Sequence, residues 1–224
     1  MVTSKISLQG KGAIHVVPDV TRITISINHH GKTYKDVYAK GKENSEWIRR
    51  ILEFNKKPGD LAKSIFFDVS EHTYNVYDDE GSGEIVEVVK DGFDLCQRIK
   101  IDIPIDNVLV NNIVRGVGKF IPNAQVQIGF TLQDPRPSQL KMLKRAVSDA
   151  KEKAVIMAEA AGAKLGKVLE INYNFSHIET YSQARNIHST EEAKASTPDA
   201  LDITPDDMVI SDRVDVVFEL ITND

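Results

Sequence analysis

The sequence predicts an α+β protein in which helices pack on one face of a mainly antiparallel sheet. Stretches that alternate between apolar and polar residues, typical of half-buried strands, are interleaved with stretches of three-and-four apolar spacing, typical of helices. After Pro18 the resulting order is strand, helix, strand, strand, helix, strand, then helix, strand, strand. The first six of these elements match a split βαβ arrangement of the ferredoxin-like kind.

Two strands are predicted at the N-terminus. The first covers about residues 6–17 and contains Gly10 and Gly12, which we interpret as permitting a bulge or bend. A phosphate-binding loop is the less favoured interpretation of these glycines, because no helix follows whose N-terminus could hold the anion. The second strand, residues 20–28, alternates isoleucine with polar residues and therefore has one solvent-facing side.

Two helices are predicted from capping residues and apolar spacing. Thr33, with Asp36 three residues later, predicts a helix that ends near Phe54. Asp106 predicts the cap of another helix, which ends near Pro122. Each helix carries apolar residues at three-and-four spacing, so each is expected to pack one face against the sheet.

A long hairpin is predicted between these helices. Its strands are residues 64–77 and a stretch that ends at Pro104, joined by the acidic, glycine-bearing turn 78–84. In the second strand, Cys96 falls on the polar face or under a helix edge. The opposite face is largely apolar and is predicted to be core; it consists of Phe93, Leu95, Gln97, Ile99, Ile101 and Ile103.

The C-terminal half predicts three further strands and the most strongly patterned helix of the chain. The strands are residues 126–132, 168–175 and 209–221, and the helix begins at Ser138 and ends at Gly162. Alanines on this helix allow close packing on a sheet. Its predicted buried face consists of Leu140, Leu143, Val147, Ala150, Ala154, Met157, Ala158 and Ala161.

Residues 176–207 are rich in Ser, Thr, Asp, Glu and Ala and almost lack apolar clusters. Such a stretch cannot repay its ordering entropy by burial, so we expect a mobile loop, or a loop that orders against a partner. Because strands and helices are interleaved throughout and no linker-like stretch interrupts them, residues 1–224 are predicted to form a single domain.

Composition excludes several classes of protein. The chain of 224 residues is 41% hydrophobic and 27% charged, as expected of a globular protein with a sizeable core. Its net charge of −5 disfavours nucleic acid as a partner. The densest basic segments, residues 49–57 and 141–153, lie on predicted helices and are interpreted as solvated helix faces.

Residues 1–9 show neither a basic segment followed by a long apolar run nor a cleavage pattern. No stretch approaches the roughly 18 apolar residues of a spanning helix. We therefore expect a soluble, cytoplasmic protein as the chain is given, or a periplasmic or envelope-associated one if a leader has been removed. Cys96 is the only cysteine, which excludes an intrachain disulfide and says nothing more about the compartment.

Two segments carry a resemblance to a known family. Residues 6–27 form a glycine-punctuated strand, then Pro18 and Asp19, then a second strand. Residues 146–171 form an alanine-rich helix with Gly162 near its end, then Leu165 and Gly166 and a strand. In this order and spacing the chain resembles the SIMPL domain family over most of its length, whereas the loop 176–207 is longer than the usual family connection.

The resemblance implies properties that the residues themselves do not. Relatives include bacterial periplasmic or envelope proteins, some linked to oxidative stress or recognised as surface immunogens, and an animal protein that binds a receptor-associated kinase. At least one bacterial relative forms a large ring or channel-like oligomer. The family carries no agreed enzymatic activity, catalytic residues or cofactor, so the resemblance supplies none for this chain.

Histidines are the candidate metal ligands of this sequence. His29 and His30 are adjacent on a strand, so their side chains should point to opposite faces, and we interpret them as surface or turn histidines. His177 and Glu179 could share one face of a strand, but no third ligand lies nearby in the sequence. We therefore predict no metal, catalytic or cofactor-binding residues.

Other candidate residues favour structural interpretations. The acidic turn 78–84 lacks the alternating ligand spacing of an EF-hand and is interpreted as a solvated hairpin tip. Cys96 has no evident base partner and is interpreted as an inert structural cysteine, buried or partly buried. Trp47 is interpreted as covering a helix edge or a subunit contact.

These observations favour a non-enzymatic scaffold or interaction protein that self-associates, with a further protein partner as an additional expectation. A long edge strand open to pairing supports self-association. The alternative is a small-molecule or metal-binding protein, or an enzyme, with a site near the loop 176–207. The carboxylates of that loop and its His177 and His188 motivate this alternative.

Overall fold

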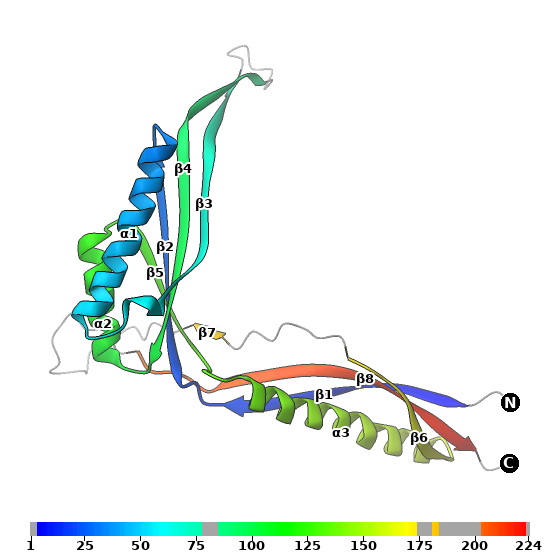
Figure 1. Ribbon diagram of the computed structural model, residues 1–224. Coiled ribbons are helices and arrows are strands. Elements are labelled where there is room, and N and C mark those ends of the chain that lie inside the picture. The colour runs from blue at the N-terminus through cyan, green and yellow to red at the C-terminus, as the bar shows by residue number, and fades with distance from the viewer. Residues whose placement is uncertain (1–3, 78–84, 174–180, 184–202, 223–224) are drawn as a thin grey trace, which may run out of the picture. The chain divides into compact units, whose positions relative to one another are not determined.

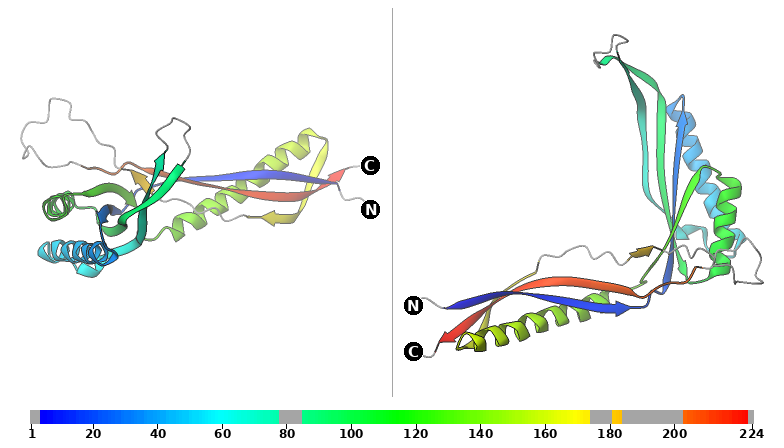
Figure 2. Two further views of the ribbon diagram at one scale, coloured as in Figure 1. Left: turned by 90° about the horizontal axis from the view of Figure 1, so that it is seen from above. Right: turned by 180° about the vertical axis from the view of Figure 1, so that it is seen from behind.

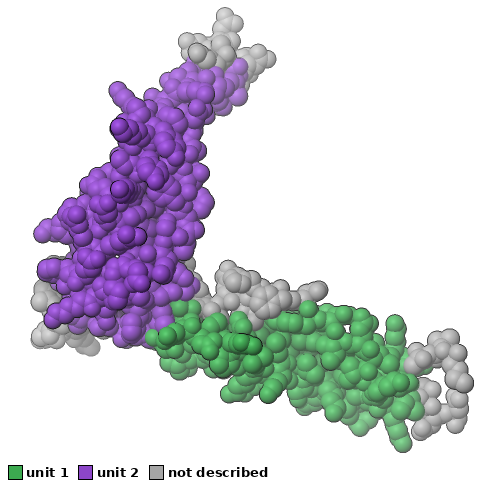
Figure 3. Space-filling view, in the orientation of Figure 1, with its two compact units in different colours: residues 1–19, 131–182, 205–224 green, residues 20–130, 183–204 purple. Residues whose placement is uncertain are grey.

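The computed structural model describes residues 4–77, 85–173, 181–183 and 203–222. Contacts divide the chain into two compact units (Figure 3). Unit 1 contains residues 1–19, 131–182 and 205–224, and unit 2 contains residues 20–130 and 183–204. The described residues form two antiparallel sheets with three α-helices packed against them, which confirms the predicted α+β class. The single domain over residues 1–224 stays a prediction.

Unit 1 is a three-stranded antiparallel sheet with one long helix along it (Figures 1 and 2). The strands lie in the order β1, β8, β6. Their bounds are β1 Lys5–Val16, β8 Met208–Thr222 and β6 Ala163–Asn172, and the helix is α3, Arg136–Ala160. The N- and C-terminal strands of the unit are therefore neighbours in space, although almost the whole chain separates them.

Helix α3 approaches the sheet mainly through alanines. Its buried residues are Met142, Ala146, Ala150, Ala154 and Ala158, one at nearly every turn. The predicted buried face was wrong in part, because Leu140 and Met157 are 53% and 50% exposed. A helix that lies very close to a strand buries the residues that permit the approach, not the most apolar ones.

Gly10 and Gly12 also serve this close approach. The pairing of β1 with β8 is continuous from Lys5 to Val16, so the predicted bulge is absent from this strand. A Cβ at Gly10 would lie 2.0 Å from the carbonyl oxygen of Ala146, and one at Gly12 would lie 2.1 Å from that of Met142. The two glycines therefore leave room for the backbone of α3.

Unit 2 contains the predicted split βαβ arrangement. Its elements in chain order are β2 Val20–Gly31, α1 Tyr34–Phe54, a 3-10 turn Gly59–Leu61, β3 Ala62–Tyr77, β4 Ile85–Pro104, α2 Asn107–Phe120 and β5 Ala124–Thr131. The sheet has the order β3, β4, β2, β5, with the short β7, Tyr181–Gln183, beside β5. Because β4 lies between β2 and β3, which α1 connects, the ferredoxin-like prediction is confirmed.

Both helices of unit 2 begin and end close to the predicted residues. The Thr33 hydroxyl accepts a hydrogen bond from the Asp36 N–H at 3.2 Å, and the Asp106 carboxylate accepts one from the Leu109 N–H at 3.0 Å. These caps satisfy backbone donors that the first turn leaves unpaired. The helices cover one sheet face through a core of large aliphatic side chains that includes Ile23, Ile25, Ile27, Ile48, Leu52, Ile99, Ile101 and Ile113.

The predicted hairpin of β3 and β4 is longer than the rest of its sheet. Strand β2 pairs with β4 only from Phe93 to Pro104. Beyond Phe93, β4 continues to Ile85 and pairs with β3 alone among the described strands. We call residues 73–77 and 85–90 the β3–β4 arm, which extends past the end of β2 in Figure 1.

Several predictions fall wholly or partly outside the described residues. These are the hairpin tip 78–84, residues 174 and 175 of the predicted strand 168–175 and, in the loop 176–207, everything except residues 181–183 and 203–207. His177, Glu179 and His188 are among them. In the part of the chain that the structure describes, no helix combines the length and apolar character needed to cross a membrane.

Candidate functional site

The face of the five-stranded sheet that the helices leave uncovered carries most of its polar side chains. On β2 and β4 the residues that alternate with the core isoleucines point to this face, which we call the open face. Cys96 lies there, as predicted. Where these two strands pair, the other polar residues on the open face are Arg22, Thr24, Ser26, Asn28, His30, Asp94, Arg98, Lys100 and Asp102.

Three side chains converge at one end of the open face. One carboxylate oxygen of Asp94 lies 2.9 Å from Nδ1 of His30, and the other lies 2.6 Å from Nδ1 of His72. The two imidazole rings meet edge to face with centroids 4.9 Å apart. We call these residues the His–Asp–His cluster. It joins β2, β3 and β4 through side chains as well as through the backbone.

The strand register explains why His30 and Asp94 lie side by side and brings His72 close to them. His30 and Asp94 are direct partners in the pairing of β2 with β4, so their side chains leave the sheet side by side. On β3, Ser70 is the direct partner of Asp94, and His72 follows two residues later on the same face. Neighbouring strands thus place all three side chains above one patch of sheet.

A β-bulge accounts for the position of His72. Glu71 pairs with Phe93 and Thr73 pairs with Lys90, so His72 lies opposite the two residues Asp91 and Gly92. Gly92 has a φ of 109°, a conformation that favours glycine. A Cβ at Gly92 would also lie 2.4 Å from the carbonyl oxygen of Gly31, where β2 ends. The backbone around the cluster is therefore specialised, not regular sheet.

The environment of the cluster favours the charged form of Asp94 and is open to water. Hydrogen bonds from His30 and His72 hold the pKa of the Asp94 carboxyl below its ordinary value, despite a small opposing effect of burial. The side chains of His30, His72 and Asp94 are 45%, 40% and 45% exposed. Two imidazoles and a carboxylate in this arrangement can bind a cation or exchange protons with solvent.

The sequence identified only one member of this cluster. His29 and His30 point to opposite faces as predicted, because His29 pairs with the buried Leu95 while His30 pairs with Asp94. The interpretation of both as surface or turn histidines missed the partners of His30. The strand register that brings in Asp94 and the bulge that brings in His72 leave no sequence signature.

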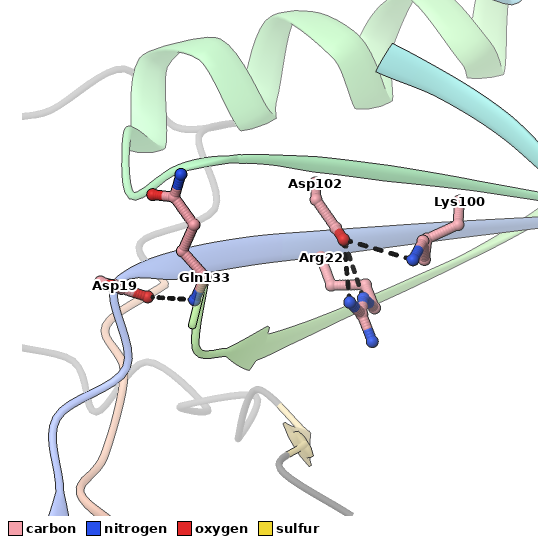
Figure 4. A network of polar contacts seen from close by, with 5 residues as sticks. All are labelled: Asp19, Arg22, Lys100, Asp102 and Gln133. Atoms are coloured by element: carbon pink, nitrogen blue, oxygen red, sulfur yellow. Dashed lines mark hydrogen bonds and ion pairs between the residues drawn. The ribbon is translucent and has the colours of Figure 1, made fainter. Parts of the chain in front are cut away.

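A second polar group lies at the other end of the open face. The Arg22 guanidinium donates two hydrogen bonds, of 2.7 and 2.8 Å, to the Asp102 carboxylate, and Lys100 lies 3.4 Å from it (Figure 4). Burial raises the pKa of Asp102, but the hydrogen bonds and charges of Arg22 and Lys100 outweigh it, so the pKa is lowered. This group stabilises the pairing of β2 with β4.

In unit 1, the side chain of Asp19, which follows β1, contacts the backbone of Gln133, which precedes α3. The Asp19 carboxylate accepts a hydrogen bond from the Gln133 N–H at 2.8 Å (Figure 4). The Asp19 N–H donates to the carbonyl oxygen of Thr131 at 3.2 Å. Pro18 and Asp19, which separate the first two strands, therefore have a structural role.

A groove lies between α1 and α2 on the side away from the sheet. Trp47 stacks on Phe120 with ring centroids 4.4 Å apart, which confirms that Trp47 covers a helix edge. The cations Arg50 and Lys119 lie over these two rings at 5.2 and 5.3 Å. The groove encloses about 520 Å³, and Phe54 at its rim is 89% exposed. It is an apolar surface bordered by positive charge.

Together these features define an α+β protein with a ferredoxin-like unit, a helix-backed three-stranded unit and a histidine–aspartate cluster on an open sheet face. A family model described as "SIMPL: Protein of unknown function (DUF541)" matches residues 6–218, and the chain belongs to this family. The resemblance inferred from residues 6–27 and 146–171 is thereby confirmed.

Individual relatives are distant. The chain is 23% identical over 174 residues to the "26 kDa periplasmic immunogenic protein" of Brucella melitensis biotype 1, a match that covers 75% of this chain and 66% of the relative. The protein of the same name from Brucella abortus has the same identity and coverage. The "Uncharacterized protein YggE" of Edwardsiella ictaluri is 20% identical over 216 residues, which cover 94% of this chain and 84% of that protein.

Proposed function

We propose that this protein is a non-enzymatic scaffold or interaction protein that assembles with copies of itself. The β3–β4 arm is the observation that carries the proposal. A two-stranded ribbon is marginally stable in water on its own. This one exposes apolar side chains on both faces, since Tyr74 and Val76 share one face while Val88, opposite Asn75, lies on the other. A partner surface would bury them.

Strand edges add to this argument. Strand β3 is an edge of the five-stranded sheet, and β1 and β6 are the two edges of the three-stranded sheet. An edge strand presents backbone donors and acceptors to a further strand. Val168, Leu169 and Ile171 of β6 are exposed beside such an edge. A second copy of the chain supplies complementary edges, and more than one edge permits assemblies larger than a dimer.

The test is the solution mass of the full chain across a wide range of concentrations, by light scattering coupled to size exclusion. We expect a discrete multimer. Val88→Lys places a charge on the arm and should dissociate the multimer, because edge lysines oppose strand pairing. Ile156→Lys, at an equally exposed position on α3, is the matched control and should leave the mass unchanged. A monomer at every concentration would refute the proposal.

The alternative function is that of a small-molecule or metal-binding protein, or an enzyme, with its site near residues 176–207. Most of that segment lies outside the described residues. Metal analysis and a thermal-shift screen of ligands, each repeated on the variant with His177 and His188 replaced, distinguish the two functions. A stabilising ligand that no longer binds after substitution of His177 and His188 would favour the alternative.

For the compartment, the names of the two Brucella relatives support the periplasm. The proposal is that this chain works in the cell envelope, the second of the two locations expected from the sequence. Fractionation of cells that produce the protein from its own gene tests it. Recovery in the cytoplasmic fraction alone would contradict this proposal and favour the cytoplasm, the first of the two expected locations.

A further inference from the structure

We propose that His30, His72 and Asp94 form a binding site for a divalent transition-metal ion, for which Zn²⁺ is the reference, at the base of the β3–β4 arm. Each residue offers one ligand atom, and these atoms lie within 4.8 Å of one another. Two imidazole nitrogens and one carboxylate oxygen form a ligand set typical of Zn²⁺. The site is independent of self-association, because one chain supplies all three ligands.

The distances require only small side-chain movements. Bonds of about 2.0–2.2 Å from Zn²⁺ to nitrogen or oxygen keep two ligands of one ion within about 4 Å of each other. The three side chains are 40–45% exposed, so rotation of the imidazoles and the carboxylate can close the remaining gap without moving the strands.

The atoms that now face each other are the atoms that would hold the ion. Asp94 bridges Nδ1 of His30 and Nδ1 of His72 through hydrogen bonds of 2.9 and 2.6 Å. A metal ion between them would take the place of the protons on Nδ1, and each imidazole would bind in its neutral form with its one proton on Nε2.

Backbone around the cluster holds the ligands on rigid strands. His30 and Asp94 are fixed by direct pairing, and the bulge opposite Asp91 and Gly92 sets the position of His72. Sites built on strands keep their geometry better than sites built on loops. Exposure leaves further coordination positions to water. The expected site is therefore a three-ligand, solvent-accessible one.

Isothermal titration of the full, tag-free chain with Zn²⁺ tests this site. We expect one ion per chain, and affinity at least about 100-fold weaker in His72→Ala and in Asp94→Asn, because each removes one of three ligands. His72→Gln is a second variant that keeps the bulk of the side chain. Circular dichroism checks that each variant is folded. Co²⁺ in place of Zn²⁺ reports the coordination by its visible absorption.

Variants of other histidines test whether Zn²⁺ binds specifically at the His–Asp–His cluster. His29→Ala changes the neighbouring residue on the same strand, and His15→Ala changes an exposed histidine of β1. Both should bind Zn²⁺ as the parent chain does, and so should the double variant His177→Ala with His188→Ala. The absence of Zn²⁺ binding, or binding that survives in His72→Ala, would overturn the proposal; loss in the double variant alone would place the metal near residues 176–207.

Discussion

The two units pack their helices against their sheets with opposite kinds of side chain. In unit 1 the helix brings alanines and the first strand brings glycines, while β8 supplies the larger Val214, Val216 and Phe218. In unit 2 both the helices and the sheet bring large aliphatic residues, such as Ile48 and Ile25. In unit 1 the helix and sheet backbones lie close together, so the interface is thin. In unit 2 the interface is thick and is filled by branched side chains.

This difference sets which substitutions each interface tolerates. Where backbones are nearly in contact, an added methyl group has no space, so enlargement is the damaging change. Where large side chains fill a thick layer, truncation leaves a cavity, so shortening is the damaging change. Four predictions test this contrast and the polar contacts that accompany it, from the largest expected effect to the smallest.

Ile25→Ala should be the most damaging of these changes and should affect unit 2. Ile25 is fully buried, and truncation of such a residue costs about 4 kcal/mol of unfolding free energy through lost burial and the remaining cavity. Urea unfolding followed by the fluorescence of Trp47, the only tryptophan, measures it, because Trp47 packs against the same core. Ser26→Ala on the open face is the control. A loss below about 1 kcal/mol would show a core that repacks easily.

Gly12→Ala should damage unit 1 although it adds a single methyl group. The new Cβ would lie 2.1 Å from the Met142 carbonyl oxygen, which is backbone and cannot rotate away. We expect a loss of about 3 kcal/mol, measured by urea unfolding and by faster hydrogen exchange in β1 and α3.

Gly118→Ala is the matched control for Gly12→Ala. Nothing lies within 4 Å of a Cβ at Gly118, which is exposed near the end of α2. Alanine there should raise stability by about 0.5–1 kcal/mol through helix propensity. If Gly12→Ala were as stable as the parent chain, α3 would have to be able to move away from β1, and the contrast between the two interfaces would fail.

The contrast also explains where the sequence was informative. Alternation and capping predicted the strands of unit 2 and the bounds of α1 and α2, because large isoleucines at regular spacing identify a thick interface. In α3 the same criterion selected Leu140 and Met157, which are exposed. Apolar size is a poor guide to burial where the interface is thin, and the alanines that are buried carry little hydrophobic signal.

The pairing of strands that lie far apart in the sequence could not be predicted either. Strand β8 joins β1 over the full length of β1, and nothing in either segment specifies the other as its partner. For the same reason the His–Asp–His cluster could not be predicted: His30, His72 and Asp94 come from three strands, and a bulge sets the position of one of them. Spacing along the chain carries information about one element at a time.

Tyr173→Phe should weaken unit 1 by about 1 kcal/mol at neutral pH through loss of a hydrogen bond to the buried Asp212. The Tyr173 hydroxyl donates to Asp212 at 2.7 Å. Partial burial, together with this hydrogen bond and the charge of Asp212, raises the pKa of Tyr173 to about 12.

The sign of the pH dependence follows from that raised pKa. An unfolded tyrosine ionises near pH 10, so the contribution of Tyr173 is complete below about pH 10 and is lost as the pH rises toward about 12. The difference in unfolding free energy between the parent chain and Tyr173→Phe should therefore narrow above about pH 10. A difference that stayed constant up to the alkaline limit would show that the hydroxyl contributes nothing to the pH dependence.

Asp102→Asn should have the smallest effect and the opposite pH dependence. The pKa of Asp102 is below its unfolded value of about 3.9, so its contribution is complete above about pH 4 and is lost as the pH falls further. The two side chains of the pair with Arg22 are 28% and 34% exposed, and solvent screening limits the contribution to about 1 kcal/mol or less. Added salt should reduce it further.

Arg22→Lys separates geometry from charge in this pair. Lysine keeps the positive charge but cannot donate two parallel hydrogen bonds to the Asp102 carboxylate, so it should reproduce part of the loss. Urea unfolding at neutral pH and below about pH 4 measures both variants. Acid should then remove a contact of unit 2 and alkali a contact of unit 1, so that pH, like side-chain size, acts on the two units in opposite directions. An Asp102→Asn difference that grew as the pH fell would reverse the sign and exclude this role for Asp102.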